Sequence, residues 1–315
     1  MKEIGGFLEL ETNYGHEFYE NCIALNSGRN CLRYLIRARG IKKIWLPKLL
    51  CSAISDICLE EKTEIFYYSV DCNLRPILTE IGNQEDWIYL INFYGQYSND
   101  EIVSYLQCHK NLVIDNVQAF YTQPIEGIDT IYTCRKYFGV PDGGYLYTNC
   151  KLSEELSKDE SYDRLSFLAG RLERSANEFY STYRENEERI DNLPLRKMST
   201  VTKNILCGIN YEKIRLIREQ NFRYLHEQLK TINLLELSIP DGPYMYPLLI
   251  KKGVEIRKKL LEKKIYIPVL WPNVLNSVGQ GEIEYYLAEN ILPLPCDQRY
   301  DLRDMKFIIQ EVYKC

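Results

Sequence analysis

Histidine and closely spaced cysteines are scarce in this sequence of 315 residues. It has only three histidines, and its eleven cysteines are scattered without a single Cys-x-x-Cys pair. A zinc site needs clustered cysteine and histidine ligands, so this pattern argues against a metal centre. An odd number of cysteines in a chain without a signal peptide indicates reduced thiols, and we expect a cytoplasmic protein.

The sequence also lacks long apolar runs and a basic excess. No run of 18 apolar residues is present, and the opening MKEIGGFLELETNYG does not resemble a secretory signal. The net charge is −5, whereas a nucleic-acid-binding domain usually shows a basic face. We therefore expect neither a membrane protein nor a nucleic-acid-binding protein. What remains is ordinary globular composition, with 45% hydrophobic residues, in a chain long enough for about two domains.

Short apolar runs alternate with helical stretches through the first half of the chain. This rhythm of strand, helix and strand predicts a mostly parallel α/β sheet with crossover helices. The expected strands are 41–47, 64–70, 87–94, 111–117, 129–134 and 143–149, and the expected helices are 31–39, 51–61 and 99–110.

The second half has a different pattern. Residues 153–190 are charged and helical, with Gly170 as an expected interruption. We predict a large α/β domain over 1–205 and a small α+β domain over 206–315. The expected elements of the small domain are a long amphipathic helix at 210–229, strands at 244–250 and 265–270, a helix at 254–264 and a final helix at 301–315 with Asp301 as its N-cap.

Ligands of open parallel sheets bind beyond the carboxyl ends of the strands, so functional residues are expected at the junctions that follow the strands. The segment 26–30 (NSGRN) places a Ser-Gly turn just before a helix. Such a turn exposes backbone N–H groups at the positive end of the helix dipole, where phosphate binds, and Arg29 adds a charged donor. A plain N-cap by Asn26 or Ser27 is the alternative, and for this segment alone the more frequent case.

Asp115 closes the predicted strand NLVID. An acid at the end of a buried strand needs a cation or a donor. Asp115 is therefore a candidate to hold a protonated ring nitrogen, a metal or a ribose, and Gln118 lies three residues further on. A turn or capping aspartate is an equally good interpretation.

Two further junctions carry reactive or aromatic side chains. Lys136 follows the strand 129–134 and precedes a Gly-rich bend, so it could be a nucleophile that forms a Schiff base, which requires a lowered pKa. A surface lysine on a hairpin loop is the alternative. The segment 92–96 (NFYGQ) follows another strand and could line a pocket, or simply pack an aromatic ring beside a turn glycine.

Taken in order, these junctions resemble the DegT/DnrJ/EryC1/StrS family of fold-type I sugar aminotransferases, which use pyridoxal phosphate (PLP). NSGRNCLRYL resembles the family's N-S-G-T-x-A-L segment, and IWLPKLLCSAI resembles V-x-P-x-x-T-F-x-A. INFYGQYSND is similar to H-L-Y-G-Q, and VIDNVQAF to D-x-A-Q/H. CRKYFGVPDGGYLYT resembles the lysine segment with its Gly-Gly pair, RKMSTVTKNIL resembles N-Y-R-M-S, and ILPLPCDQRYDLRDM the closing L-x-L-P. The resemblance covers most of the chain and depends on the order and spacing of these segments.

The resemblance implies the fold of PLP-dependent transferases of the aspartate aminotransferase type, with a mixed, mostly parallel sheet, helices on both faces and a small C-terminal α+β domain. It implies PLP as the cofactor and a homodimer with shared active sites. The implied reaction moves an amino group from an amino acid, expected to be glutamate, to a keto group of a nucleotide-linked sugar, in surface-polysaccharide or secondary-metabolite biosynthesis. A PLP-dependent sugar dehydratase, or a non-catalytic protein that binds PLP or a nucleotide sugar, is the alternative.

Residue roles follow from the same resemblance. Lys136 would be the Schiff-base lysine and proton carrier, Asp115 would keep the pyridinium nitrogen protonated, and Gln118 would contact the ring hydroxyl. Retention of Lys136 argues against the relatives that carry a histidine there and act as dehydratases. The substrate-binding residues would include Arg196 and Lys197, which would reach the neighbouring subunit's site.

The remaining cofactor contacts include two departures from the family. Ser27, Gly28 and Arg29 would bind the phosphate with help from Thr133, and Arg29 stands where the family has threonine. The family's aromatic that stacks on the cofactor ring falls at Cys51. Either Cys51 or another aromatic such as Phe93 or Tyr94 is therefore expected against the ring, and Tyr94 is also expected to contact the substrate.

Overall fold

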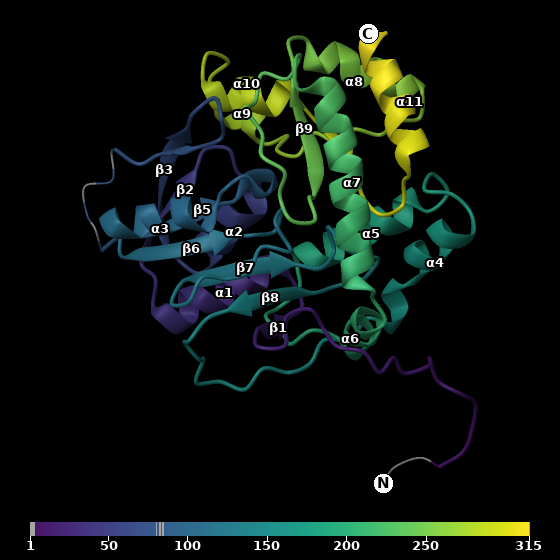
Figure 1. Cartoon of the computed structure of the whole chain (residues 1–315). Helices are drawn as coiled ribbons and strands as arrows, with labels where there is room; N and C mark the ends of the chain where they lie inside the picture. Colours follow the sequence, from purple (N-terminus) through teal and green to yellow (C-terminus); the bar gives the residue numbers. More distant parts are fainter. Residues whose placement is uncertain (1–3, 80, 82, 84, 315) are drawn as a thin grey trace.

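An eight-stranded sheet forms the frame of the larger part of the molecule (Figure 1). The computed structural model describes residues 4–79, 81, 83 and 85–314. The strand order is β1-β8-β7-β6-β5-β2-β3-β4, and the neighbours from β7 through β3 run parallel, whereas β1, β8 and β4 pair antiparallel. The strands are β1 (Ile23–Leu25), β2 (Lys43–Pro47), β3 (Glu64–Val70), β4 (Pro76–Ile77), β5 (Trp87–Ile91), β6 (Asn111–Asp115), β7 (Asp129–Thr133) and β8 (Gly144–Tyr147). The sheet is thus mixed and mostly parallel, as predicted.

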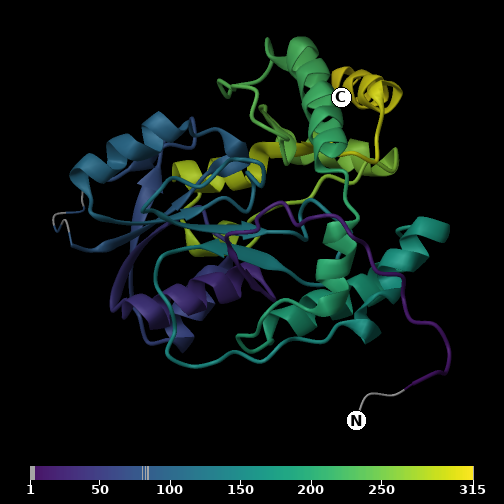
Figure 2. The ribbon, with the colours of Figure 1, turned by 60° about the horizontal axis from the view of Figure 1, so that its bottom comes forward.

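Helices cover both faces of this sheet. Figure 2 shows α1 and α3 on opposite sides of it. Central strands covered on both faces are buried along their length, and all five residues of β7 are buried. The helices that surround the sheet are α1 (Gly28–Arg39), α2 (Ser52–Glu60), α3 (Asn99–Cys108), α4 (Ser166–Glu173), α5 (Tyr180–Asp191) and α6 (Thr200–Cys207), with 3₁₀ turns at Phe93–Gly95 and Tyr162–Arg164.

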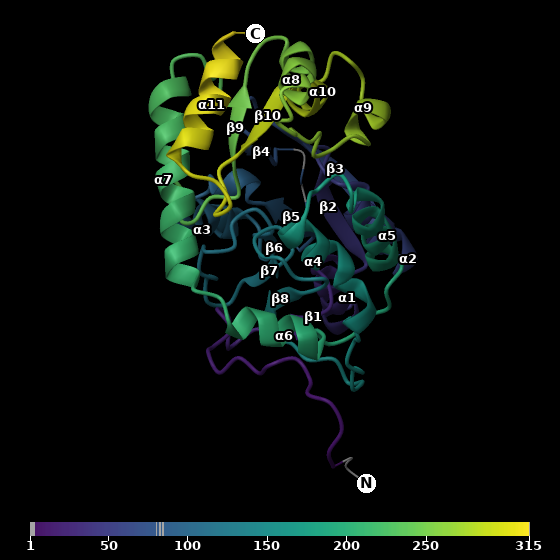
Figure 3. The ribbon, with the colours of Figure 1, turned by 90° about the vertical axis from the view of Figure 1, so that its right-hand side faces the viewer.

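A second, two-stranded sheet has its own apolar core. Figure 3 shows the long helix α7 and the final helix α11 side by side next to this sheet. The core includes Phe222 and Leu225 of α7, which the amphipathic pattern predicted, and Met305 of α11. The elements are α7 (Tyr211–Leu229), β9 (Met245–Leu249), α8 (Gly253–Glu262), α9 (Val274–Ser277), α10 (Ile283–Asn290), β10 (Ile291–Pro295) and α11 (Leu302–Tyr313). The domain boundary at residue 205 stays a prediction.

Four predicted elements differ in the structure. The stretch predicted to be helical over 153–190 is not helical over 153–161, and residues 174–179 separate α4 from α5. Residues 265–270 form no strand, and β9 pairs with β10 instead. Gly170 lies inside α4 and does not interrupt it; its Cα packs so closely on Phe179 that a Cβ would come within 2.3 Å of the ring. The strand predicted over 87–94 ends at Ile91, because Tyr94 adopts a left-handed conformation with φ 54° that cannot continue a strand.

Among the described residues, no helix combines the length and the hydropathy needed to span a bilayer. Within the same residues, no group of three or more histidine, cysteine, aspartate or glutamate side chains is placed to hold a metal ion.

The N-cap predicted at Asp301 is confirmed. Its carboxylate accepts hydrogen bonds from the backbone N–H groups of Arg303 and Asp304. The Asp304 carboxylate in turn accepts a hydrogen bond from the Asp301 backbone N–H. We expect Asp301→Ala to lower the free energy of unfolding by about 1 kcal/mol, the usual contribution of an N-cap. Urea unfolding measures this, with the exposed Lys306→Ala on the same helix as the control. Equal stability of the two variants would contradict the assigned cap.

Candidate active site

Three structural elements meet at the carboxyl edge of the sheet. In the parallel register Asp115, the last residue of β6, lies between Ile91 of β5 and Ile131 of β7. The first turn of α1 adjoins the segments that follow β6 and β7: a Cβ built on Gly28 would lie 3.6 Å from Thr133 Cβ and 3.7 Å from Val117 Cγ1. The predicted acid, the predicted lysine turn and the predicted phosphate segment are therefore neighbours in space.

Asp115 is buried and tightly held. Its carboxylate accepts hydrogen bonds from Tyr89 Oη at 2.8 Å and from the Val117 backbone N–H at 2.8 Å. Burial raises the pKa of Asp115, whereas the charge of Lys136 and these two hydrogen bonds lower it. A carboxylate fixed in this way is suited to hold a cationic group of a ligand.

Lys136 lies in the turn that follows β7. Its ammonium lies 5.5 Å from the centre of the Tyr244 ring, and its side chain reaches solvent. Desolvation of its ammonium by the surrounding protein lowers the pKa of Lys136, and the charge of Arg135 lowers it further, whereas Asp115 and Cys51 raise it. An accessible amine with a lowered pKa has the character of a nucleophile. Because its charge acts on Asp115 and Asp115 acts on it, the two groups form an electrostatically linked pair.

Gln118 and Tyr94 lie on the segments that follow β6 and β5 and are hydrogen-bonded to each other. Gln118 Oε1 accepts a hydrogen bond of 2.9 Å from the Tyr94 backbone N–H and so stabilises the left-handed turn there. The Tyr94 side chain is fully buried, and its hydroxyl has no hydrogen-bond partner among the described residues. Strained backbone and an unsatisfied buried hydroxyl concentrate at functional sites. The sequence-based analysis put Tyr94 in the site but had no signal for its backbone conformation.

The predicted phosphate segment is the N-terminus of α1. Ser27 is the N-cap, and its Oγ accepts a hydrogen bond of 3.2 Å from the Asn30 N–H, so this hydroxyl serves the helix. The Gly-Gly pair that follows Lys136 packs against the same turn. A Cβ on Gly144 would lie only 2.8 Å from Gly28 N, and Gly143 has φ 115°. The glycine pair therefore allows β8 to approach the start of α1 closely.

Two arginines flank this helix start, and α5 neutralises both. Arg29 Nη1 lies 2.5 Å from Asp191 Oδ1, and Arg135 pairs with Glu187 one turn earlier on the same helix. Burial lowers the pKa of Arg135 to about 10, and the charge of Arg29 lowers it as well. Sequence reasoning identified Arg29 but missed the other three residues, because their pairing depends on how α5 folds back over the sheet.

The remaining predicted residues lie in three places. Cys51 is the exposed N-cap residue of α2, and it lies close enough to Lys136 to raise the pKa of that lysine. Thr133 ends β7, where its hydroxyl lies 3.4 Å from the Gly143 carbonyl. Arg196 and Lys197 lie beside β1, where their side chains pair with carboxylates of their own chain, Asp159 and Glu155, at 3.3 and 3.9 Å. Their action at a neighbouring subunit's site stays a prediction.

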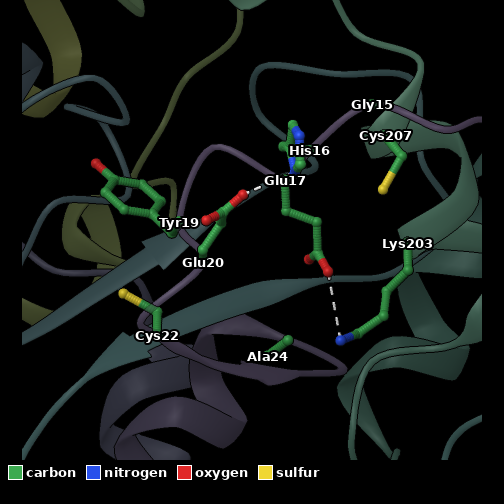
Figure 4. A pocket seen from close by; sticks show the side chains of 9 residues that line it. All are labelled: Gly15, His16, Glu17, Tyr19, Glu20, Cys22, Ala24, Lys203 and Cys207. Carbon is green, nitrogen blue, oxygen red and sulfur yellow. Dashed lines mark ion pairs between the residues drawn. The ribbon is translucent and has the colours of Figure 1, made fainter.

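A separate cavity of about 280 Å³ lies between the N-terminal segment and α6 (Figure 4). Inside it Lys203 Nζ lies 3.4 Å from Glu17 Oε1, and His16 lies 3.0 Å from Glu20. None of the residues predicted for the active site lines this cavity. Its charged groups are already paired with one another, so we assign it no part in the chemistry at Lys136.

Comparison with solved structures identifies the fold. No family model and no curated protein matches the chain. A DegT/DnrJ/EryC1/StrS aminotransferase from Brucella abortus is 17% identical over 93% of this chain and 85% of that one, with a TM-score of 0.64. A sugar aminotransferase from Micromonospora echinospora is 13% identical over 93% and 87%, with a TM-score of 0.65. The chain therefore has the fold of PLP-dependent transferases, as predicted, and its structural neighbours include members of the DegT/DnrJ/EryC1/StrS family.

The same fold also carries a different chemistry. A GDP-4-keto-6-deoxy-D-mannose-3-dehydratase from E. coli, whose structure holds hydrated PLP, is 13% identical over 92% of this chain and 87% of that one, with a TM-score of 0.63. The fold alone thus does not choose between amino transfer and dehydration. The choice depends on the residues of the site.

Proposed function

We propose that this chain is a PLP-dependent aminotransferase that transfers an amino group from an amino acid, expected to be glutamate, to a keto group of a nucleotide-linked sugar. The observation that carries the proposal is the linked pair of Lys136 and Asp115 at the carboxyl edge of the sheet, beside the N-terminus of α1. The assignment of a sugar as the acceptor is supported by the family resemblance and by a structural neighbour that is a sugar aminotransferase. A cytoplasmic homodimer with shared sites, and a role in surface-polysaccharide or secondary-metabolite biosynthesis, belong to the same proposal.

The residues present fit PLP. An accessible amine, a buried carboxylate and a set of helix N-terminal N–H groups match the aldehyde, the ring nitrogen and the phosphate of PLP, respectively. Of the two positions that depart from the family, Arg29 still offers a donor for the phosphate, whereas the Cys51 thiol cannot stack on the ring as an aromatic would. When bound, PLP supplies an electron sink for the bonds at the substrate carbon.

The chain's own residues have distinct tasks in this proposal. Lys136 would hold the cofactor covalently, and its amine would carry a proton during the reaction. Asp115 would keep a proton on the ring nitrogen, and the hydrogen bonds from Tyr89 and Val117 hold its carboxylate in place. Gln118 would contact the ring hydroxyl. Gly28 and Arg29 would hold the phosphate, with help from Thr133.

Absorption spectroscopy tests the proposal. The purified protein with added PLP is expected to develop a visible band, and borohydride is expected to fix the cofactor covalently on Lys136, as peptide mass spectrometry would show. Absence of both the band and the label would reject the proposal and favour a protein that uses the fold only for binding. Product analysis with and without an amino donor separates amino transfer from dehydration, because dehydration consumes no donor.

The ion pair between Arg29 and Asp191 allows a further prediction about the affinity for PLP. If Arg29 binds the phosphate, the Asp191 carboxylate competes with that phosphate for its guanidinium. We expect Asp191→Asn to lower the Kd for PLP about threefold, in proportion to a partly exposed ion pair. A fluorescence titration measures this. Asp163→Asn is the matched control, because Asp163 pairs at 2.8 Å with Arg189 of α5, the helix that also carries Asp191. A Kd that rises or stays constant in Asp191→Asn would contradict the role of Arg29.

A further inference from the structure

Arg218 of α7 is a charged side chain buried in the middle of the protein. It is 1% exposed, and no ion pair within 4.0 Å is found for it among the described residues, although its charge lowers the pKa of the buried Asp297. A buried cation without a carboxylate in direct contact is costly unless its N–H groups are all used in hydrogen bonds. The partners that Arg218 has instead are therefore informative about why the chain keeps it there.

All three nitrogens of the guanidinium donate hydrogen bonds to groups around the lysine turn. Arg218 Nη2 donates to the carbonyl of Tyr137, the residue after Lys136, at 3.2 Å. Its Nε donates to Gln298 Oε1 at 2.8 Å, and Gln298 Nε2 donates to the same Tyr137 carbonyl at 2.7 Å. The guanidinium also lies over the Tyr137 ring, 4.6 Å from its centre. The backbone next to Lys136 is thus held by two donors that belong to α7 and to the segment after β10.

The third guanidinium nitrogen binds the segment that carries Tyr244, whose ring lies near the Lys136 ammonium. Arg218 Nη1 donates to the carbonyls of Pro243 and Tyr244 at 2.9 and 3.3 Å. The Tyr244 ring lies 5.5 Å from Lys136 Nζ. One guanidinium therefore fixes both the turn that carries Lys136 and the ring that faces its ammonium.

We propose that Arg218, with Gln298, is a positioning residue that sets the direction and the surroundings of the Lys136 side chain. This inference rests on the proposed function, in which Lys136 is the reacting amine. Neither residue touches Lys136 Nζ. The groups that act on Lys136 directly are Asp115, Cys51, Arg135 and the Tyr244 ring, and Arg218 reaches them only through Tyr137 and Tyr244. A displacement of about 1 Å at a reacting group can reduce a rate about a hundredfold.

The test measures Lys136 itself, before any cofactor is added. The protein is labelled with a trace of acetic anhydride over a series of pH values, and peptide mass spectrometry reports the reaction at Lys136. Arg218→Met keeps the aliphatic length and removes every donor. Gln298→Ala removes the second donor to the Tyr137 carbonyl. Because Gln298 is only half-buried, this variant can replace Arg218→Met in the test if Arg218→Met does not fold. Arg223→Met, exposed on the same helix, is the matched control.

We expect both test variants to raise the pKa of Lys136, because a loosened turn admits water that stabilises the ammonium. Labelling of Lys136 near pH 8 then falls about tenfold, the change that a rise of one in the pKa produces. The visible band with PLP is expected to form more slowly in the same variants, while Arg223→Met behaves as the unchanged protein in both measurements.

Two outcomes would overturn the proposal. One is unchanged labelling and an unchanged band in folded Arg218→Met and Gln298→Ala. The other is a lower melting temperature with an unchanged pH profile of Lys136, which would make Arg218 a structural residue only. Failure of the proposed function is distinguishable from both, because then the unchanged protein itself would form no band with PLP, while the labelling comparison would still decide the role of Arg218.

Discussion

Replacement of Lys136 by alanine is expected to abolish amino transfer, with a loss on the order of a thousandfold or more, as for other covalent catalytic residues. The physical reason is that the site offers one accessible amine with a lowered pKa next to the buried carboxylate of Asp115. Without that amine no covalent link to PLP can form and no group remains there to carry the proton. The visible band should be lost from the spectrum, and borohydride should leave no label at position 136.

Lys203→Ala is the control for this prediction, because Lys203 lies in the separate cavity near Glu17 and has no part in the site. It should keep the band and the activity. The fold of Lys136→Ala should be retained, since the exposed side chain contributes little packing. Retained turnover by a folded Lys136→Ala protein would remove the assignment of this lysine altogether.

Asp115→Asn is expected to reduce turnover about a hundredfold or more, the scale on which removal of a preorganised charge acts on a rate. Asparagine keeps the size and can still accept a hydrogen bond from the Val117 N–H, so the backbone turn should persist. What is lost is the negative charge that stabilises a protonated ring nitrogen. Steady-state kinetics should show the decrease mainly in kcat, and the band with PLP should form with lower affinity.

The matched control for Asp115→Asn is Asp129→Asn. Asp129 is also buried, but it lies at the start of β7, at the opposite edge of the sheet, where it pairs with Arg39 at 2.8 Å. Its replacement should lower stability and leave the reaction with PLP unchanged. If the two variants lost activity equally, the effect of Asp115 would have to be attributed to folding and not to a charge beside the cofactor.

The parts of the fold and the site that could be predicted from sequence depend on local patterns. The apolar runs that became β2, β3, β6 and β7 are short and clearly bounded, and the capping residue Asp301 acts on N–H groups only two and three residues further along the chain. Asp115 and Lys136 could be singled out because both follow strands in the chain, and parallel strands place their carboxyl ends at one edge. The spacing of the Gly143–Gly144 pair from Lys136 is visible in the sequence, whereas the packing of this pair against Gly28 is not.

The parts that sequence could not predict depend on contacts between distant segments. In the sequence Arg218 is one of several charged residues on an amphipathic helix. It is buried because Tyr137 and Gln298, which are distant in the sequence, pack against it. The pairing of α5 with Arg29 and Arg135 is equally non-local. Residues 265–270 have strand-forming side chains, but β9 takes its one partner from β10, so tertiary pairing overrides local preference there.

The hydrogen bonds on the Tyr137 carbonyl have a consequence for how the chain could be divided. A fragment ending before α7 would contain the whole eight-stranded sheet with Asp115 and Lys136, yet it would lack both donors that hold the lysine turn. The complementary fragment would contain those donors and nothing for them to orient. The reactive side chains and the donors that orient the lysine turn thus belong to separate stretches of the polypeptide. Cleavage between the two stretches should therefore yield two inactive fragments, and activity should return only when the fragments reassemble.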